Sequence, residues 1–154
     1  MRLSYVGEAG WEITCKAPNA TRIYDALFAA GARSSGLYAQ TAMRIEKGFL
    51  HWKADLLTEY NPMESDLARF VRPDKAFIGK PALEGMVASG PRRLFVTLDI
   101  ACDHAPAHPG ASVLVEGQVI GTVTSAAWGH RIARNLAMAF VEPARAAQGT
   151  AVEV

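Results

Sequence analysis

The feature that most constrains the fold is a change of pattern at the cluster Ser89-Gly90-Pro91. Before this cluster, apolar residues recur at the spacing of amphipathic helices, whereas after it they form short runs separated by turn residues. Because Gly and Pro interrupt regular structure, the cluster is the best candidate for a domain boundary. We therefore predict an α+β protein in two parts, residues 1–88 and residues 91–154.

The first part is expected to hold a partial antiparallel sheet with helices. Its opening residues, 2–16, are typical of a hairpin around Gly7 and Gly10, because glycine accepts backbone angles that other residues resist. Helical spacing predicts an amphipathic helix at about residues 19–31 and a second helical stretch at about residues 38–47. The remaining expected elements are a long loop at residues 51–66, a strand at residues 67–71 and a short helix with Pro81 at its first position.

The second part has the pattern of a small antiparallel β-barrel. Glu116-Gly117, between two apolar runs, indicates a tight hairpin. A β-domain of about 60 residues buries little surface, so we expect it to dock on the first part. The expected strands cover residues 93–100, 112–116, 118–125, 135–141 and 150–154.

Charge and composition narrow the class of partner. The formal net charge is +1, which argues against nucleic acid and against an anionic membrane surface. The sequence has neither a signal-peptide pattern nor a run of about 18 apolar residues, so we expect a cytoplasmic protein. Cys15 and Cys102 are far apart and are expected to be reduced and buried. A small molecule or another protein is the expected partner.

Only one segment resembles a metal-binding sequence. Cys102, His104 and His108 are residue types that zinc accepts, and they lie close together in the chain. Two prolines and a glycine mark the segment as a surface loop, and no further Cys or His group completes a four-ligand site. We therefore expect no metal.

Three residues are candidates for ligand binding. Glu12 could accept two parallel hydrogen bonds from a flat N–H/NH₂ edge such as that of a pterin, or it is an exposed strand residue. Tyr5 could stack on an aromatic ring, or it is a half-buried strand residue. Arg44 could pair with a ligand carboxylate or carbonyl, or it forms an ion pair within the protein.

Several cations could meet an anionic ligand tail. Solvated surface charge is the usual explanation for such residues, and no spacing distinguishes the two. These cations are Lys47, Lys53, Arg131 and Arg134.

Ordered motifs along the chain resemble the aminomethyltransferase (glycine cleavage T-protein) family. They cover residues 4–13, 43–49, 51–56 and 77–83 in the first part, and residues 119–125 and 135–141 in the second. The run from Arg44 to Leu56 is more similar to the folate-binding halves of dimethylglycine and sarcosine dehydrogenases than to the stand-alone transferase.

This resemblance implies a function in one-carbon chemistry. In those dehydrogenases an FAD module oxidises an N-methyl group, and a folate module captures the carbon on tetrahydrofolate. The implied partners of this chain are a folate, an N-methylated amino acid and the N-terminal, FAD-binding part of a parent protein. The resemblance also implies that Glu12 binds the pterin, that Tyr5 lines the folate site and that Arg44 lies on the ligand side.

The chain departs from the family pattern at several points. The arginine of the family's Gly-Leu-Gly-Ala-Arg-Asp segment has no counterpart in residues 36–41, and Lys53 replaces a glycine. The family's catalytic aspartate precedes the segment that begins this chain. We therefore expect a fragment of a folate-dependent N-methylglycine dehydrogenase, with no catalytic residue and no activity of its own. The alternatives are a fragment of an aminomethyltransferase or related folate-dependent demethylase, and a non-catalytic folate-scaffold module.

Overall fold

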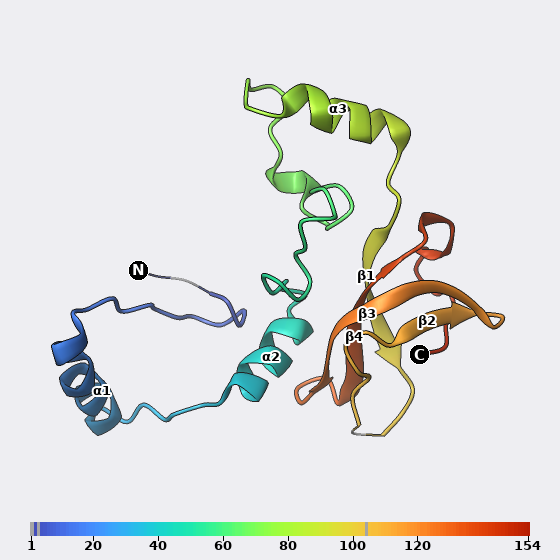
Figure 1. The fold of residues 1–154 in the computed structure, drawn as a ribbon. Coiled ribbons are helices and arrows are strands. Elements are labelled where there is room, and N and C mark those ends of the chain that lie inside the picture. Colours follow the sequence, from blue (N-terminus) through green and yellow to red (C-terminus); the bar gives the residue numbers. More distant parts are fainter. Residues whose placement is uncertain (1, 3, 104) are drawn as a thin grey trace.

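The computed structural model describes residues 2, 4–103 and 105–154 and has the predicted α+β composition (Figure 1). Helices occupy the first part of the chain, and a four-stranded sheet occupies the second. The helices are α1 (Ala20–Ala29), α2 (Leu37–Glu46) and α3 (Lys80–Ser89), with short 3₁₀ turns at Ala17–Asn19, Ala68–Phe70 and Pro143–Arg145. The strands are β1 (Leu94–Ile100), β2 (Ser112–Val115), β3 (Gln118–Gly129) and β4 (Arg134–Val141).

The sheet is antiparallel throughout, in the order β1-β4-β3-β2. Its centre is β4, which is buried at every position after Arg134. The predicted β2–β3 hairpin is confirmed: Glu116 and Gly117 have φ values of 50° and 76°, as a two-residue hairpin turn of the primed type requires. Burial of β4 on both faces explains its nearly continuous apolar sequence.

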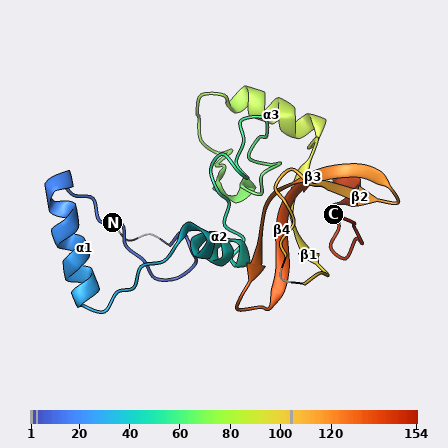
Figure 2. The same ribbon diagram turned by 60° about the horizontal axis from the view of Figure 1, so that its bottom comes forward.

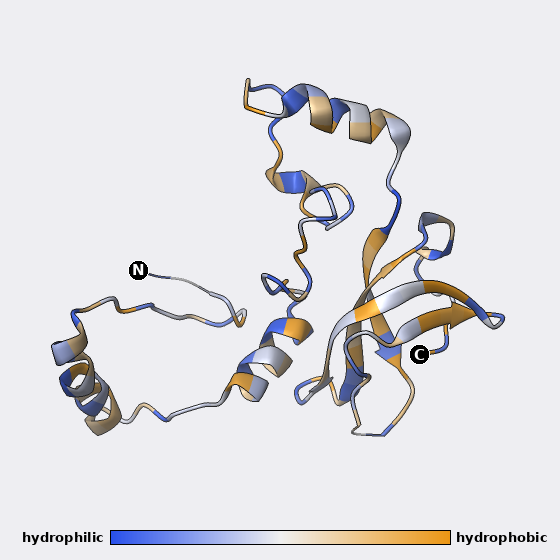
Figure 3. Cartoon of the chain, in the orientation of Figure 1, coloured by the Kyte–Doolittle hydropathy of each residue, from blue (hydrophilic) through white to orange (hydrophobic). Residues whose placement is uncertain are grey.

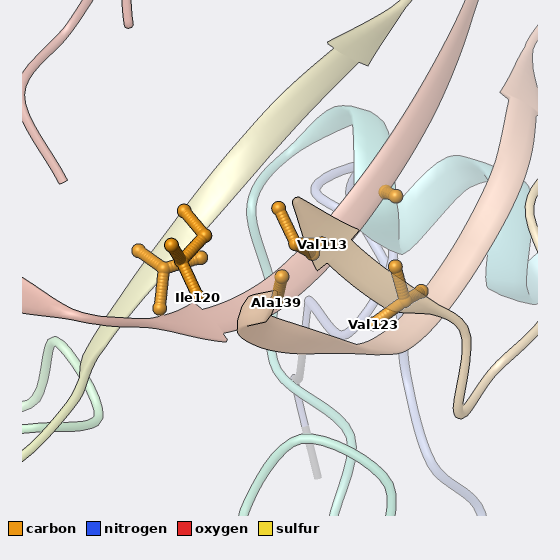
Figure 4. Packing of buried hydrophobic residues seen from close by; sticks show 6 residues of the cluster. Val113, Ile120, Val123 and Ala139 are labelled. Carbon is orange, nitrogen blue, oxygen red and sulfur yellow. The ribbon is translucent and has the colours of Figure 1, made fainter. Parts of the chain in front are cut away.

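The core of the sheet consists of small and β-branched side chains, which suit a pleated surface. Val113, Ile120, Val123 and Ala139 pack together on one face of the sheet (Figure 4). Gly121 lies against β4 so closely that a Cβ at this position would overlap the Phe140 carbonyl oxygen. The glycine therefore permits the close approach of β3 to β4.

Helix α2 is the element that attaches the first part to the sheet. Ile45 of α2 is buried with Leu136 and Met138 of β4, and Phe95 and Ala127 pack around them. Figure 2 shows α2 lying against the sheet, while α1 and α3 lie away from it. No residue of α1 or α3 is fully buried. The expectation that the β-domain docks on the first part therefore holds through α2.

The first part is extended rather than compact. The chain exposes 10910 Å², whereas a compact protein of this mass exposes about 7,600 Å². Helix α1 is amphipathic, yet Tyr24, Leu27 and Phe28 on it are exposed. Figure 3 shows hydrophobic residues along the strands as well. Within the described residues no helix is both long and apolar enough to cross a membrane.

Three predicted β elements differ in the structure. The strand prediction at residues 67–71 is wrong: Ala68–Phe70 is a 3₁₀ turn, closed by hydrogen bonds from Phe70 N to Leu67 O and from Val71 N to Ala68 O. A strand needs a neighbouring strand, and none lies beside this segment in the described chain. For the same reason the expected N-terminal hairpin is reduced to one bridge, Arg2–Trp11, and the expected last strand to the bridge Leu114–Glu153.

Two further expectations need correction. Cys15 and Cys102 are free thiols, as predicted, but both are exposed, so the prediction that they are buried is wrong. Strand β3 continues beyond residue 125 to Gly129, because its later residues pair with the first half of β4.

A buried carboxylate joins the loop before α3 to the start of the sheet. Glu64 accepts hydrogen bonds from Arg92 N (2.8 Å) and Arg92 Nε (3.1 Å), and from Asn61 N (3.0 Å). Its backbone carbonyl accepts from Phe95 N at the start of β1. Hydrogen bonds from Arg92 lower the pKa of Glu64 from 4.5 to about 2. The Glu64–Arg92 pair therefore stabilises the folded state when Glu64 is ionised.

This pKa predicts an acid-sensitive contribution to stability. Since the pKa of Glu64 is lower in the folded state, its contribution is complete above pH 4.5 and is lost as the pH falls toward about 2. In Glu64→Gln the free energy of unfolding, measured by urea titration, should therefore be lower than in the wild type at neutral pH. The free energy of unfolding of Glu64→Gln should also fall less steeply than that of the wild type as the pH is lowered from 4.5 to about 2. Glu84→Gln, which removes an exposed partner of Lys80, is the control, and equal pH profiles for wild type and Glu64→Gln would contradict the prediction.

Candidate functional site

An ion pair buried on both sides joins α2 to the loop that follows it. Arg44 Nη1 lies 2.5 Å from Asp55 Oδ2, and the two side chains are 2% and 0% exposed. Arg44 is on the last turn of α2, where helical spacing turns it toward the sheet and leaves Lys47 exposed. Of the two alternatives for Arg44, the ion pair within the protein is therefore present.

The hydrogen bonds of Asp55 extend this pair to the β-domain. Asp55 accepts from the backbone N of His51 (2.9 Å), from Thr124 Oγ1 (2.5 Å) and from Ser125 Oγ (2.7 Å). Arg44 Nη2 also donates to Ser125 Oγ at 2.8 Å. Hydrogen bonds to a carboxylate are shorter and stronger than those between neutral groups. The cluster thus joins α2, the loop at residues 51–56 and β3 by charge-assisted hydrogen bonds.

Tyr5 lies beside this cluster. Its ring meets that of His51 edge-on, with the ring centroids 6.3 Å apart. Burial raises the pKa of the Tyr5 hydroxyl; the charge of Arg44 opposes this rise and that of Asp55 adds to it. Within the described chain, neither the buried hydroxyl of Tyr5 nor the buried Nε of Arg44 has a hydrogen-bond partner. Two buried polar atoms without a partner therefore occur in one region.

Glu12 occupies a different environment. It follows the turn at residues 7–10 and is exposed, in an extended segment outside any strand. The structure thus brings Tyr5 and Arg44 into one cluster and places Glu12 further along the same segment as Tyr5. The ligand roles of all three residues stay predictions.

A large groove opens between the two parts of the chain. It has a volume of about 1420 Å³ and lies between α2, the loop at residues 53–60, the loop at residues 105–110 and strand β3. Tyr60 stacks on Phe140 in its wall, with the ring centroids 3.8 Å apart. Aromatic and cationic side chains around an apolar surface can hold a flat, polar-edged ligand. Its lining includes Tyr38, Arg44, Lys53, Tyr60, Ser125 and Trp128.

Sequence reasoning missed Asp55, Thr124 and Ser125. All three lie within the motifs at residues 51–56 and 119–125, but no local spacing links a carboxylate to hydroxyls so distant in the chain. Of the suspected metal ligands, His104 lies outside the described residues. Within the described residues, no group of three or more His, Cys, Asp or Glu side chains could hold a metal ion.

The buried ion pair predicts that substitutions of two aspartates differ greatly in their effect on the free energy of unfolding. In Asp55→Ala the charge of Arg44 stays buried without its partner, which should reduce the free energy of unfolding by about 3–5 kcal/mol. Asp99→Ala removes the exposed partner of Arg134 and should cost about 1 kcal/mol or less. Guanidinium chloride titration of both variants measures the difference. Equal losses would show that the Arg44–Asp55 pair does not hold the two parts together.

Two family models match the sequence. The model described as the GCVT N-terminal domain matches residues 1–75, and the glycine cleavage T-protein C-terminal barrel domain matches residues 92–154.

Similar proteins include human mitochondrial dimethylglycine dehydrogenase, which is 36% identical over all of this chain and 18% of its own length. Human mitochondrial sarcosine dehydrogenase is 35% identical over 92% of this chain and 16% of its own length. An aminomethyltransferase from Symbiobacterium thermophilum is 33% identical over 99% of this chain and 42% of its own length. The chain therefore spans less than a fifth of the two dehydrogenases and less than half of the transferase.

A solved structure has the same fold. The glycine cleavage system aminomethyltransferase T from Bartonella henselae superposes with a TM-score of 0.90 and 29% identity. The match covers 96% of this chain and 42% of that protein.

Proposed function

Because the chain belongs to the glycine cleavage T-protein family, we propose that it is the folate-binding part of a protein that transfers a one-carbon unit to tetrahydrofolate. This proposal rests on one observation: motifs that are far apart in the sequence lie together in the fold. Tyr5, Arg44, Asp55 and Ser125 come from four separate motifs and lie in a single cluster. Such convergence is expected of a ligand-binding wall, since fold maintenance alone does not require unpartnered polar atoms there.

The residues present fit a folate. A pterin offers a flat edge of N–H and NH₂ donors, and the carboxylate of Glu12 can accept two parallel hydrogen bonds from it. Tyr5 has an aromatic face and a hydroxyl whose pKa is raised by burial. Both terminal nitrogens of Arg44 are engaged by protein groups, and the buried Nε is the one side-chain nitrogen of Arg44 without a partner in the described chain.

For the parent protein we propose an N-methylglycine dehydrogenase of the dimethylglycine or sarcosine type. The support is the extent of the similarity, which covers all of this chain in dimethylglycine dehydrogenase. In such a protein an FAD-bearing part would release the one-carbon unit, and the residues of this chain would bind and orient the folate that accepts it.

A second candidate is an aminomethyltransferase of the glycine cleavage type. The superposition with the Bartonella henselae aminomethyltransferase, at a TM-score of 0.90, favours it. The visible absorbance of the purified full-length protein distinguishes the two, because only the dehydrogenase is proposed to carry a flavin. A flavin spectrum supports the dehydrogenase, and its absence at full occupancy of folate supports the transferase.

Glu12 provides the direct test of folate binding. In the full-length protein, Glu12→Gln should weaken folate affinity by roughly 1.5–3 kcal/mol, the contribution of hydrogen bonds to a charged group. Isothermal titration measures this change. Glu84→Gln, on the exposed face of α3, is the matched control and should bind folate like the wild type. If Glu12→Gln binds as tightly as the wild type, the proposed role of this carboxylate is wrong.

A further inference from the structure

We propose that Arg131, at the β3–β4 turn, is a positioning residue that holds the turn at residues 7–10, and through it Glu12, in the folate site. The predicted effect on folate binding rests on the proposed function. The contacts between Arg131 and the turn are independent of it. Arg131 is far from Glu8 in sequence, yet its Nη1 lies 3.1 Å from Glu8 Oε1. The second part of the chain thereby reaches the segment that precedes Glu12.

The β3–β4 turn is itself anchored. Glu46, the last residue of α2, accepts hydrogen bonds through Oε1 from Arg131 N (2.8 Å) and Ile132 N (3.2 Å). Gly129 lies against the same carboxylate, since a Cβ there would come within 3.0 Å of Glu46 Oε1. The backbone of Arg131 is therefore fixed relative to α2, and its side chain extends from a defined position.

The turn at residues 7–10 meets α2 from the other side. Gly7 has a φ of 74°, and a Cβ there would overlap the side-chain carbons of Lys47. Lys47 Nζ lies 3.7 Å from Glu8 Oε1, the same oxygen that Arg131 contacts. Ser4 Oγ donates to the Glu8 carbonyl at 2.7 Å and closes the turn. Glu8 is thus the point at which two cations from different parts of the fold meet.

The turn leads directly into the segment that holds Glu12. Residues 11–22 are exposed, and α1 buries no residue, so the apolar packing that fixes β4 is missing here. The bridge between Arg2 and Trp11 joins the two arms of the turn. Glu12 follows Trp11 directly, so the backbone connects its position to that of the turn.

The expected effect on binding is modest. The side chains of Arg131 and Glu8 are 70% and 52% exposed. A single exposed ion pair of this kind changes an equilibrium by about fivefold at most. Salt should weaken the contact, because exposed charges are screened.

Backbone nitrogen-15 NMR relaxation tests the clamp in the full chain without any ligand. In Arg131→Ala, residues 4–12 should have lower order parameters than in the wild type, while β1 and β4 stay unchanged. Arg131→Lys should restore most of the order, since a cation at the same place can still meet Glu8. Arg134→Ala, which removes the exposed pair with Asp99, is the matched control and should leave the order parameters of residues 4–12 unchanged. Unchanged order parameters of residues 4–12 in Arg131→Ala would overturn the proposal.

Folate titration of the same variants separates this inference from the proposed function. Arg131→Ala should bind folate roughly two- to fivefold more weakly, and Arg131→Lys should bind like the wild type. If the wild type fails to bind folate, the proposed function fails and the relaxation result still decides whether Arg131 holds the turn. If the wild type binds and Arg131→Ala binds equally well, Arg131 does not position the site.

Discussion

The structure depends on the buried ion pair between Arg44 and Asp55. Burying two charges is unfavourable unless their attraction and further hydrogen bonds offset the lost hydration. Here Thr124 and Ser125 supply those hydrogen bonds from β3, and the backbone of His51 supplies another. Because the donors come from both parts of the chain, the pair is satisfied only when α2 lies on the sheet.

The first part is held to the sheet mainly by polar contacts. Apart from Ile45 and its neighbours, its helices bury little apolar surface. Instead, Glu64 meets Arg92 at the start of the sheet, and Glu46 meets the β3–β4 turn. Polar contacts are directional, whereas apolar packing is not, so they fix the orientation of the segments that carry Tyr5 and Glu12.

This arrangement fits a binding site in which a ligand supplies hydrogen-bond partners that the protein itself does not. Tyr5 and Arg44 hold buried polar atoms without partners in the described chain, and Arg44 also lines a groove with aromatic walls. The Arg44–Asp55 pair keeps the guanidinium in place without a ligand, so a ligand would meet a wall that is already formed. A preorganised wall avoids the entropic cost of ordering side chains on binding.

The sequence by itself determined the local elements: α1, α2, the four strands and the hairpin at Glu116-Gly117 follow from residue spacing and turn chemistry. It did not determine whether residues 67–71 pair as a strand, because pairing requires a neighbour that only the fold supplies. The sequence also did not determine that Arg44 contacts Ser125 or that Glu8 contacts Arg131. These residues are 81 and 123 positions apart, and a contact over such a distance depends on how the elements pack.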